Sequence, residues 1–103
     1  MRRLPPALAA SATPQILELL GEAPGRVLEI GFAGIHARPL ELAGWDVVVL
    51  DGDWQARERS DNVVDEARGR FDAVIALAGT DLSGVDAARI VLVDDRGVAS
   101  MHE

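Results

Sequence analysis

The stretch VLEIGFAGIHA, residues 27–37, decides the fold class of this chain. Its apolar run from Val27 to Ile30 contains one acid, Glu29, and ends at Gly31, and Gly34 follows three residues later. This pattern predicts a strand, a glycine-containing loop and a helix, because glycine permits sharp turns and left-handed backbone angles. Nucleotide-binding folds share the pattern with many loops that bind nothing.

Short helices alternate with apolar strands around this stretch. Helices are predicted at residues 13–20, 38–43 and 54–60, and strands at 26–30, 45–51, 62–64, 71–77 and 89–94. Thr13 is expected to cap the first helix, and Ser83 a single helical turn within the loop before the last of these strands. Residues 95–97 predict a hairpin turn into an antiparallel edge strand at 98–101. Together these elements predict an α/β layer sandwich with a mostly parallel sheet and a C-terminal antiparallel hairpin.

Length and composition indicate one globular domain. A chain of 103 residues has room for a single core, and 49% hydrophobic with 26% charged residues is typical of a folded protein. We expect residues 1–12 to be a flexible N-terminal arm and residues 13–103 to form the domain. Pro5 and Pro6 shorten the apolar stretch of the arm, which argues against a secretory leader.

Charge and cysteine content exclude several classes of function. The net charge of −7 argues against binding to nucleic acid, whose phosphates require a basic surface. No window reaches the ~20 apolar residues of a membrane span. The absence of cysteine excludes disulfides and thiolate chemistry and fits a cytoplasmic protein.

Acidic residues follow the second predicted strand, where a ligand would lie. In open α/β sheets ligands bind outside the carboxyl ends of the strands, at the point where the strand order reverses. Asp51 lies 20 residues after Gly31. This is the spacing at which an acid meets the two hydroxyls of a ribose. Asp53 is the competing candidate.

Three segments resemble the class I S-adenosylmethionine-dependent methyltransferases. VLEIGFAGI, residues 27–35, is similar to their first motif, in which an acid in the first strand precedes glycines at alternate positions. VVVLD, residues 47–51, resembles the strand that ends at their ribose-binding acid, and FDAVIA, residues 71–76, resembles their fourth-strand motif. The resemblance covers residues 13–94 and implies a Rossmann-like three-layer sandwich that binds S-adenosylmethionine.

The resemblance also implies a set of cofactor-binding residues. Asp65 is the best match to the family's adenine-contacting acid. The candidate set is Glu29, Gly31, Phe32, Ala33, Gly34, Asp51, Gly52, Asp53 and Asp65. For Glu29, a role as partner of loop N–H groups and a direct ligand contact are both open. The sequence departs from the family at Ala33 and Ile35, where second and third glycines are usual, and Pro39 delays the following helix.

The function implied is a small methyltransferase-like domain that binds S-adenosylmethionine or its product. Methyl transfer by direct displacement would depend on a partner protein or a second copy to complete the substrate pocket, and no catalytic residue is identified. The alternative is a non-catalytic Rossmann-like module that acts by protein association. Binding of a nicotinamide dinucleotide is less favoured, because its GxGxxG motif would need glycines at Ala33 and His36.

The remaining ionisable candidates have ordinary explanations. His36 lies near the predicted cleft and is either a general base or an exposed loop imidazole. Asp94 and Asp95 are interpreted as turn residues. No metal site is expected, because nothing in the sequence fixes a ligand geometry for the acids.

Overall fold

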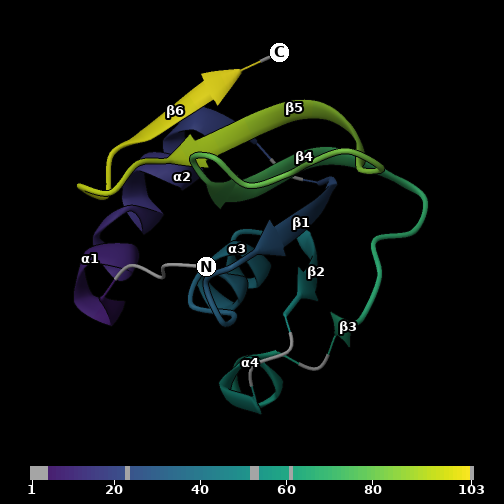
Figure 1. The fold of residues 1–103 in the computed structure, drawn as a ribbon, viewed down its shortest axis with the longest axis horizontal. Helices are drawn as coiled ribbons and strands as arrows, with labels where there is room; N and C mark the ends of the chain where they lie inside the picture. Colours follow the sequence, from purple (N-terminus) through teal and green to yellow (C-terminus); the bar gives the residue numbers. More distant parts are fainter. Residues whose placement is uncertain (1–4, 23, 52–53, 61, 103) are drawn as a thin grey trace.

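The computed structural model describes residues 5–22, 24–51, 54–60 and 62–102. Its strands form one sheet with the order β3-β2-β1-β4-β5-β6 (Figure 1). The helices are α1 (Pro6–Ser11), α2 (Thr13–Leu20), α3 (Ala37–Leu42) and α4 (Trp54–Arg59). The strands are β1 (Arg26–Ile30), β2 (Asp46–Leu50), β3 (Val63–Val64), β4 (Arg70–Leu77), β5 (Asp86–Val93) and β6 (Ala99–His102).

β1 is the central strand of the parallel part of the sheet. Leu28 pairs with Val48 of β2 on one side and with Val74 of β4 on the other, and both pairings are parallel. The chain builds outward from β1 to β2 and β3, then returns to add β4 and β5 on the opposite side. The strand order therefore reverses beside β1. β6 pairs antiparallel with β5, as the hairpin signal predicts.

All four described helices contribute to one buried cluster on the same face of the sheet. Ala9, Ile16, Leu40 and Ala56, one from each helix, belong to a single buried cluster with alternate strand residues such as Val27. We call this the helical face. Figure 1 shows α2 and α3 behind the strands on this side.

Loops cover the other face of the sheet. Its core consists of Leu28, Val48, Phe71 and Val74, and the partly buried side chains packed on them include Ala67, Leu82 and Val85 from the connections between strands. We call this the loop-covered face. Within the described residues helices lie on one side of the sheet alone, so the third layer of the expected sandwich is not seen there. Residues 65–69 and 78–85 are shorter than the roughly 10–12 residues that a crossover with its own helix requires.

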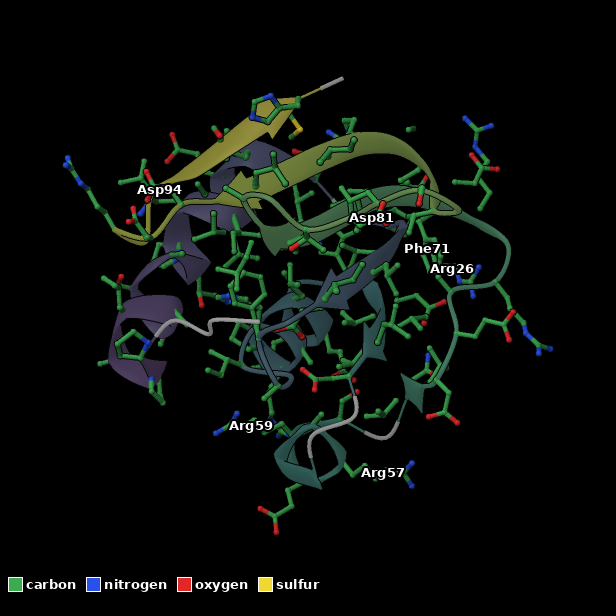
Figure 2. All side chains as sticks on the ribbon, viewed as in Figure 1. Arg26, Arg57, Arg59, Phe71, Asp81 and Asp94 are labelled. Carbon is green, nitrogen blue, oxygen red and sulfur yellow. The ribbon has the colours of Figure 1, made fainter. Side chains whose placement is uncertain are left out.

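Arg26 fastens the first of these connections to the sheet. Its guanidinium lies 4.3 Å from the centre of the Phe71 ring, and Nη1 donates to the carbonyl oxygens of Arg68 and Arg70 (Figure 2). Arginine above an aromatic face combines electrostatic attraction with coverage of apolar surface. Arg26 thereby shields one edge of the loop-covered face from water.

Two other expectations differ from the structure. The predicted flexible arm contains α1, whose Ala9 is buried, whereas residues 1–4 lie outside the described residues. α1 reaches the core because it packs against the β5–β6 turn at Gly97, where an added Cβ would lie 3.0 Å from Leu8. The helical turn expected after Ser83 is absent from the described chain, because β5 already begins at Asp86.

The packing on the loop-covered face predicts a large effect of Leu28→Ala. Leu28 is fully buried there, and truncation of a buried leucine leaves a cavity, so the free energy of unfolding should fall by about 2–5 kcal/mol. Leu42→Ala is the matched control, because Leu42 is 77% exposed and its loss should change stability by less than about 0.5 kcal/mol. Urea denaturation measures both. Equal, small effects would show that the loops do not bury this face.

Candidate functional site

The loop after β1 folds into two tight turns. Ile35 N–H donates to the Phe32 carbonyl and Ala37 N–H to the Gly34 carbonyl, each at 3.1 Å. The φ angles of Gly31, Ala33 and Gly34 are 86°, 52° and 80°. Among the described residues other than glycine, Ala33 is the one with a positive φ. L-residues adopt this conformation at some cost in free energy. An outside interaction must therefore hold Ala33.

Two carboxylates hold the backbone of this loop. Asp51 Oδ2, just after β2, accepts the Ala33 N–H at 2.9 Å, and Glu29 Oε1, within β1, accepts the His36 N–H at 3.1 Å. Glu29 is fully buried and Asp51 is 9% exposed. The structure thus brings Glu29 and Asp51 together at the loop, as the sequence predicts, and shows Glu29 as a partner of a loop N–H group.

His36 is fully buried, so it is not the exposed loop imidazole that the sequence left open as one interpretation. Its Nδ1 shares a hydrogen bond of 2.7 Å with Thr13 Oγ1, at the start of α2. Its ring also meets the Phe32 ring edge-on, with 4.7 Å between centroids and 71° between planes. Thr13 therefore does not cap α2 with its side chain but ties that helix to the loop.

Burial shifts the pKa values of Glu29 and His36 in opposite directions. Removal from water raises the pKa of Glu29 to about 7; the His36 N–H and Arg59 oppose this rise, and Asp51 adds to it. Burial lowers the pKa of His36 to about 4, so its imidazole is neutral at pH 7. Among the described residues, Glu29 Oε2 and His36 Nε2 are the buried side-chain atoms without a hydrogen-bond partner.

α4 packs directly on the glycine loop, which the sequence did not predict. An added Cβ at Gly34 would lie 3.2 Å from Arg59 Cβ and 3.4 Å from the Ala56 carbonyl oxygen, so glycine permits the close approach. Arg59 Nη1 donates to the Ala33 carbonyl at 3.1 Å. No motif links residue 59 to the loop, so tertiary structure alone identifies Arg59 as a site residue.

Departures from the family motif have visible consequences here. Ile35 is half-buried and packs against the core of the helical face. Gly31 faces the end of β4, where an added Cβ would have Leu77 Cδ1 as its neighbour at 3.8 Å. A Cβ at Gly31 would therefore make one ordinary van der Waals contact and no clash.

The other candidate residues lie apart from the loop or outside the description. Gly52 and Asp53 lie outside the described residues. Asp65 is exposed and lines a separate hollow of about 440 Å³ near Arg26, Arg57 and Val48. Asp94 accepts N–H groups of Arg96 and Val98, both at 2.9 Å, which lower its pKa and confirm it as a turn residue.

Comparisons with family models, curated proteins and solved structures found no match to this chain. In the part of the chain that the structure describes, no three acidic or histidine side chains are placed to hold a metal ion. No helix among those residues has the length and apolar character needed to cross a membrane. The site is therefore interpreted from its own geometry.

The opposite pKa shifts of Glu29 and His36 predict two opposite pH dependences of the free energy of unfolding. Single substitutions should reveal each one separately. Folded Glu29 keeps its proton up to about pH 7, whereas its ordinary pKa is 4.5, so its contribution is complete below pH 4.5 and is lost as pH rises to 7. Folded His36 resists protonation down to about pH 4, whereas its ordinary pKa is 6.5, so its contribution is complete above pH 6.5 and is lost as pH falls. Each contribution amounts to about 3 kcal/mol.

In the unmodified protein the Glu29 contribution to stability falls with pH while the His36 contribution rises. These two pH dependences nearly cancel between pH 4.5 and 6.5. Glu29→Gln should leave the His36 profile, with stability rising from pH 4 to 6.5. His36→Asn should leave the Glu29 profile, with stability falling from pH 4.5 to 7. Urea denaturation across this range measures all three proteins, and parallel profiles would refute the assignment.

The bond between α2 and the loop predicts a cost for Thr13→Val. This substitution keeps the shape of the side chain but leaves buried His36 Nδ1 without its partner, so the free energy of unfolding should fall by about 1–3 kcal/mol. Thr80→Val is the control, because Thr80 is half-buried in a loop and has no side-chain hydrogen bond among the described residues. Thermal unfolding distinguishes the two, and equal melting temperatures would contradict a structural role for the bond.

Proposed function

We propose that this chain binds S-adenosylmethionine or its demethylated product, S-adenosylhomocysteine, as a small methyltransferase-like domain of Rossmann type. The observation that carries the proposal is the contact of Asp51 with the loop that follows β1, at the point where the strand order reverses. In open α/β sheets, ligands bind outside the carboxyl ends of the strands at such a reversal. Three conditions thus coincide: a turn rich in positive φ angles, a neighbouring acid and the reversal.

The described residues fit such a nucleotide at two positions. Asp51 Oδ2 accepts the Ala33 N–H, which places this carboxylate beside the glycine loop, and a carboxylate is the kind of acceptor that ribose hydroxyls require. Gly31 offers backbone without a side chain toward the end of β4. Glu29 would act indirectly, since it fixes the loop through the His36 N–H.

The bound cofactor would supply an electrophilic methyl group. The contribution of the protein to such a displacement is mainly the placement of the reacting groups, which requires few acid or base residues. No described residue is assigned a catalytic role. A partner protein or a second copy of the chain would complete the pocket for the methyl acceptor.

A second candidate function is association without catalysis. The observation that favours it is the loop-covered face, where Leu28, Val48, Phe71 and Val74 form a core without a helix above it in the described chain. The loops bury these four side chains, so another protein would reach them only by displacing the loops. The two functions are distinguished by nucleotide binding.

Calorimetric titration of the full chain tests the proposal. S-adenosylhomocysteine should bind with micromolar affinity, and NAD should not bind. Asp51→Asn keeps an oxygen that accepts the Ala33 N–H but lowers its strength toward ribose, so affinity should fall roughly tenfold. Asp46→Asn is the matched control, because Asp46 is exposed at the opposite end of β2 and should leave affinity unchanged.

Two results would count against nucleotide binding. If S-adenosylmethionine, its product and NAD all give no binding signal, nucleotide binding is rejected and association with another protein is favoured. Equal affinities of the two Asp variants would remove Asp51 from the site. Loss of folding in Asp51→Asn, detected by circular dichroism, would require Asp51→Glu as the replacement variant, which retains the charge and should retain binding.

A further inference from the structure

A second hollow lies on the outer side of the glycine loop, bordered by three helices. Its volume is about 520 Å³, within the range of small-molecule sites. Its lining residues are Pro6 and Ala10 from α1, Gly34 and Ile35 from the loop, Arg38 from α3, and Glu58 and Arg59 from α4. We call it the arginine hollow.

Two arginines line this hollow in a chain of net charge −7. Arg38 is exposed and makes no hydrogen bond or ion pair with any described residue. Arg59 gives one N–H to the Ala33 carbonyl. Each guanidinium carries five N–H donors, so most of these donors are left for a ligand.

The negative charges nearby do not neutralise these arginines by direct contact. Glu58 lines the hollow, and Glu41 borders a smaller hollow of about 210 Å³ beside Arg38. Neither forms an ion pair with Arg38 or Arg59 in the described structure. The buried imidazole of His36 adds no charge at pH 7.

Gly34 explains why both arginines border one space. A side chain at this position would meet Arg59 Cβ and the backbone of Ala56, so only glycine lets α4 come this close to the loop. Pro6, Ala10 and Ile35 provide an apolar wall beside the guanidinium groups. A ligand that fits both parts combines an oxyanion with a short hydrocarbon segment.

We infer that the arginine hollow binds a small organic oxyanion, a carboxylate or phosphate ester with a short apolar tail, through Arg38 and Arg59. Planar guanidinium groups match the geometry of both kinds of oxyanion. The arginine hollow borders Gly34 and Ile35, whereas the proposed nucleotide site faces Gly31 and the end of β4. The inference therefore does not depend on the proposed function.

Titration of the isotope-labelled full chain with hexanoate, hexyl phosphate and inorganic phosphate tests the inference by NMR. Hexanoate or hexyl phosphate should shift the amide signals of Gly34 and Ile35, and the tighter of the two identifies the oxyanion. Inorganic phosphate should bind more weakly, because it leaves the apolar wall uncovered. Affinity should fall as sodium chloride is raised.

Arg38→Gln should weaken binding of the preferred probe roughly tenfold, since it removes a charge-assisted contact. Its melting temperature should stay unchanged because Arg38 has no partner in the described structure. Arg57→Gln is the matched control, since Arg57 and Arg59 leave α4 on different sides and Arg57 lines the other hollow (Figure 2). Arg59→Gln provides a second test, with folding checked by circular dichroism.

Three results would overturn the inference: no binding of any probe, binding that Arg38→Gln and Arg59→Gln leave intact, or equal weakening by Arg57→Gln, which would indicate a general charge effect. S-adenosylhomocysteine affinity measured on Arg38→Gln should match that of the unmodified chain. Failure of that nucleotide to bind either protein would reject the proposed function while leaving the oxyanion inference standing.

Discussion

The capture of one loop by two acidic side chains is the constraint on which the rest of this structure depends. Glu29 and Asp51 leave neighbouring parallel strands at the same edge of the sheet and accept the N–H groups of His36 and Ala33. This holds Ala33 in a left-handed conformation that an alanine does not favour. The loop therefore presents a fixed backbone path, which is what a ligand-binding turn requires.

The same loop joins the helical layer to the sheet. Thr13 reaches it from α2 through His36, and Arg59 reaches it from α4 through the Ala33 carbonyl. This packing buries Glu29 and His36. Burial raises the pKa of Glu29 and lowers the pKa of His36, and both shifts favour the neutral form of the side chain. Both groups thus enter the core without a full charge near neutral pH, which limits the cost of removing them from water.

Placing the described helices on one face leaves the sheet asymmetric. Short connections cover the opposite face, and Arg26 closes it at Phe71. Residues of α1, α3 and α4 line the arginine hollow beside the loop. Residues 31–38 consequently form the segment around which these features gather. They are the reversal of strand order, Asp51 at the end of β2, and the arginines Arg38 and Arg59.

The sequence by itself determined the strands and their alternation with short helices, because apolar periodicity and glycine positions are local signals. It also marked Glu29, Gly31 and Asp51, since the ends of adjacent parallel strands meet at one edge. Tertiary structure alone decided that His36 is buried, that Thr13 bonds to it rather than capping a helix, and that Arg59 joins the site. It also decided the two-layer arrangement. These features depend on contacts between residues far apart in the chain, which no local pattern specifies.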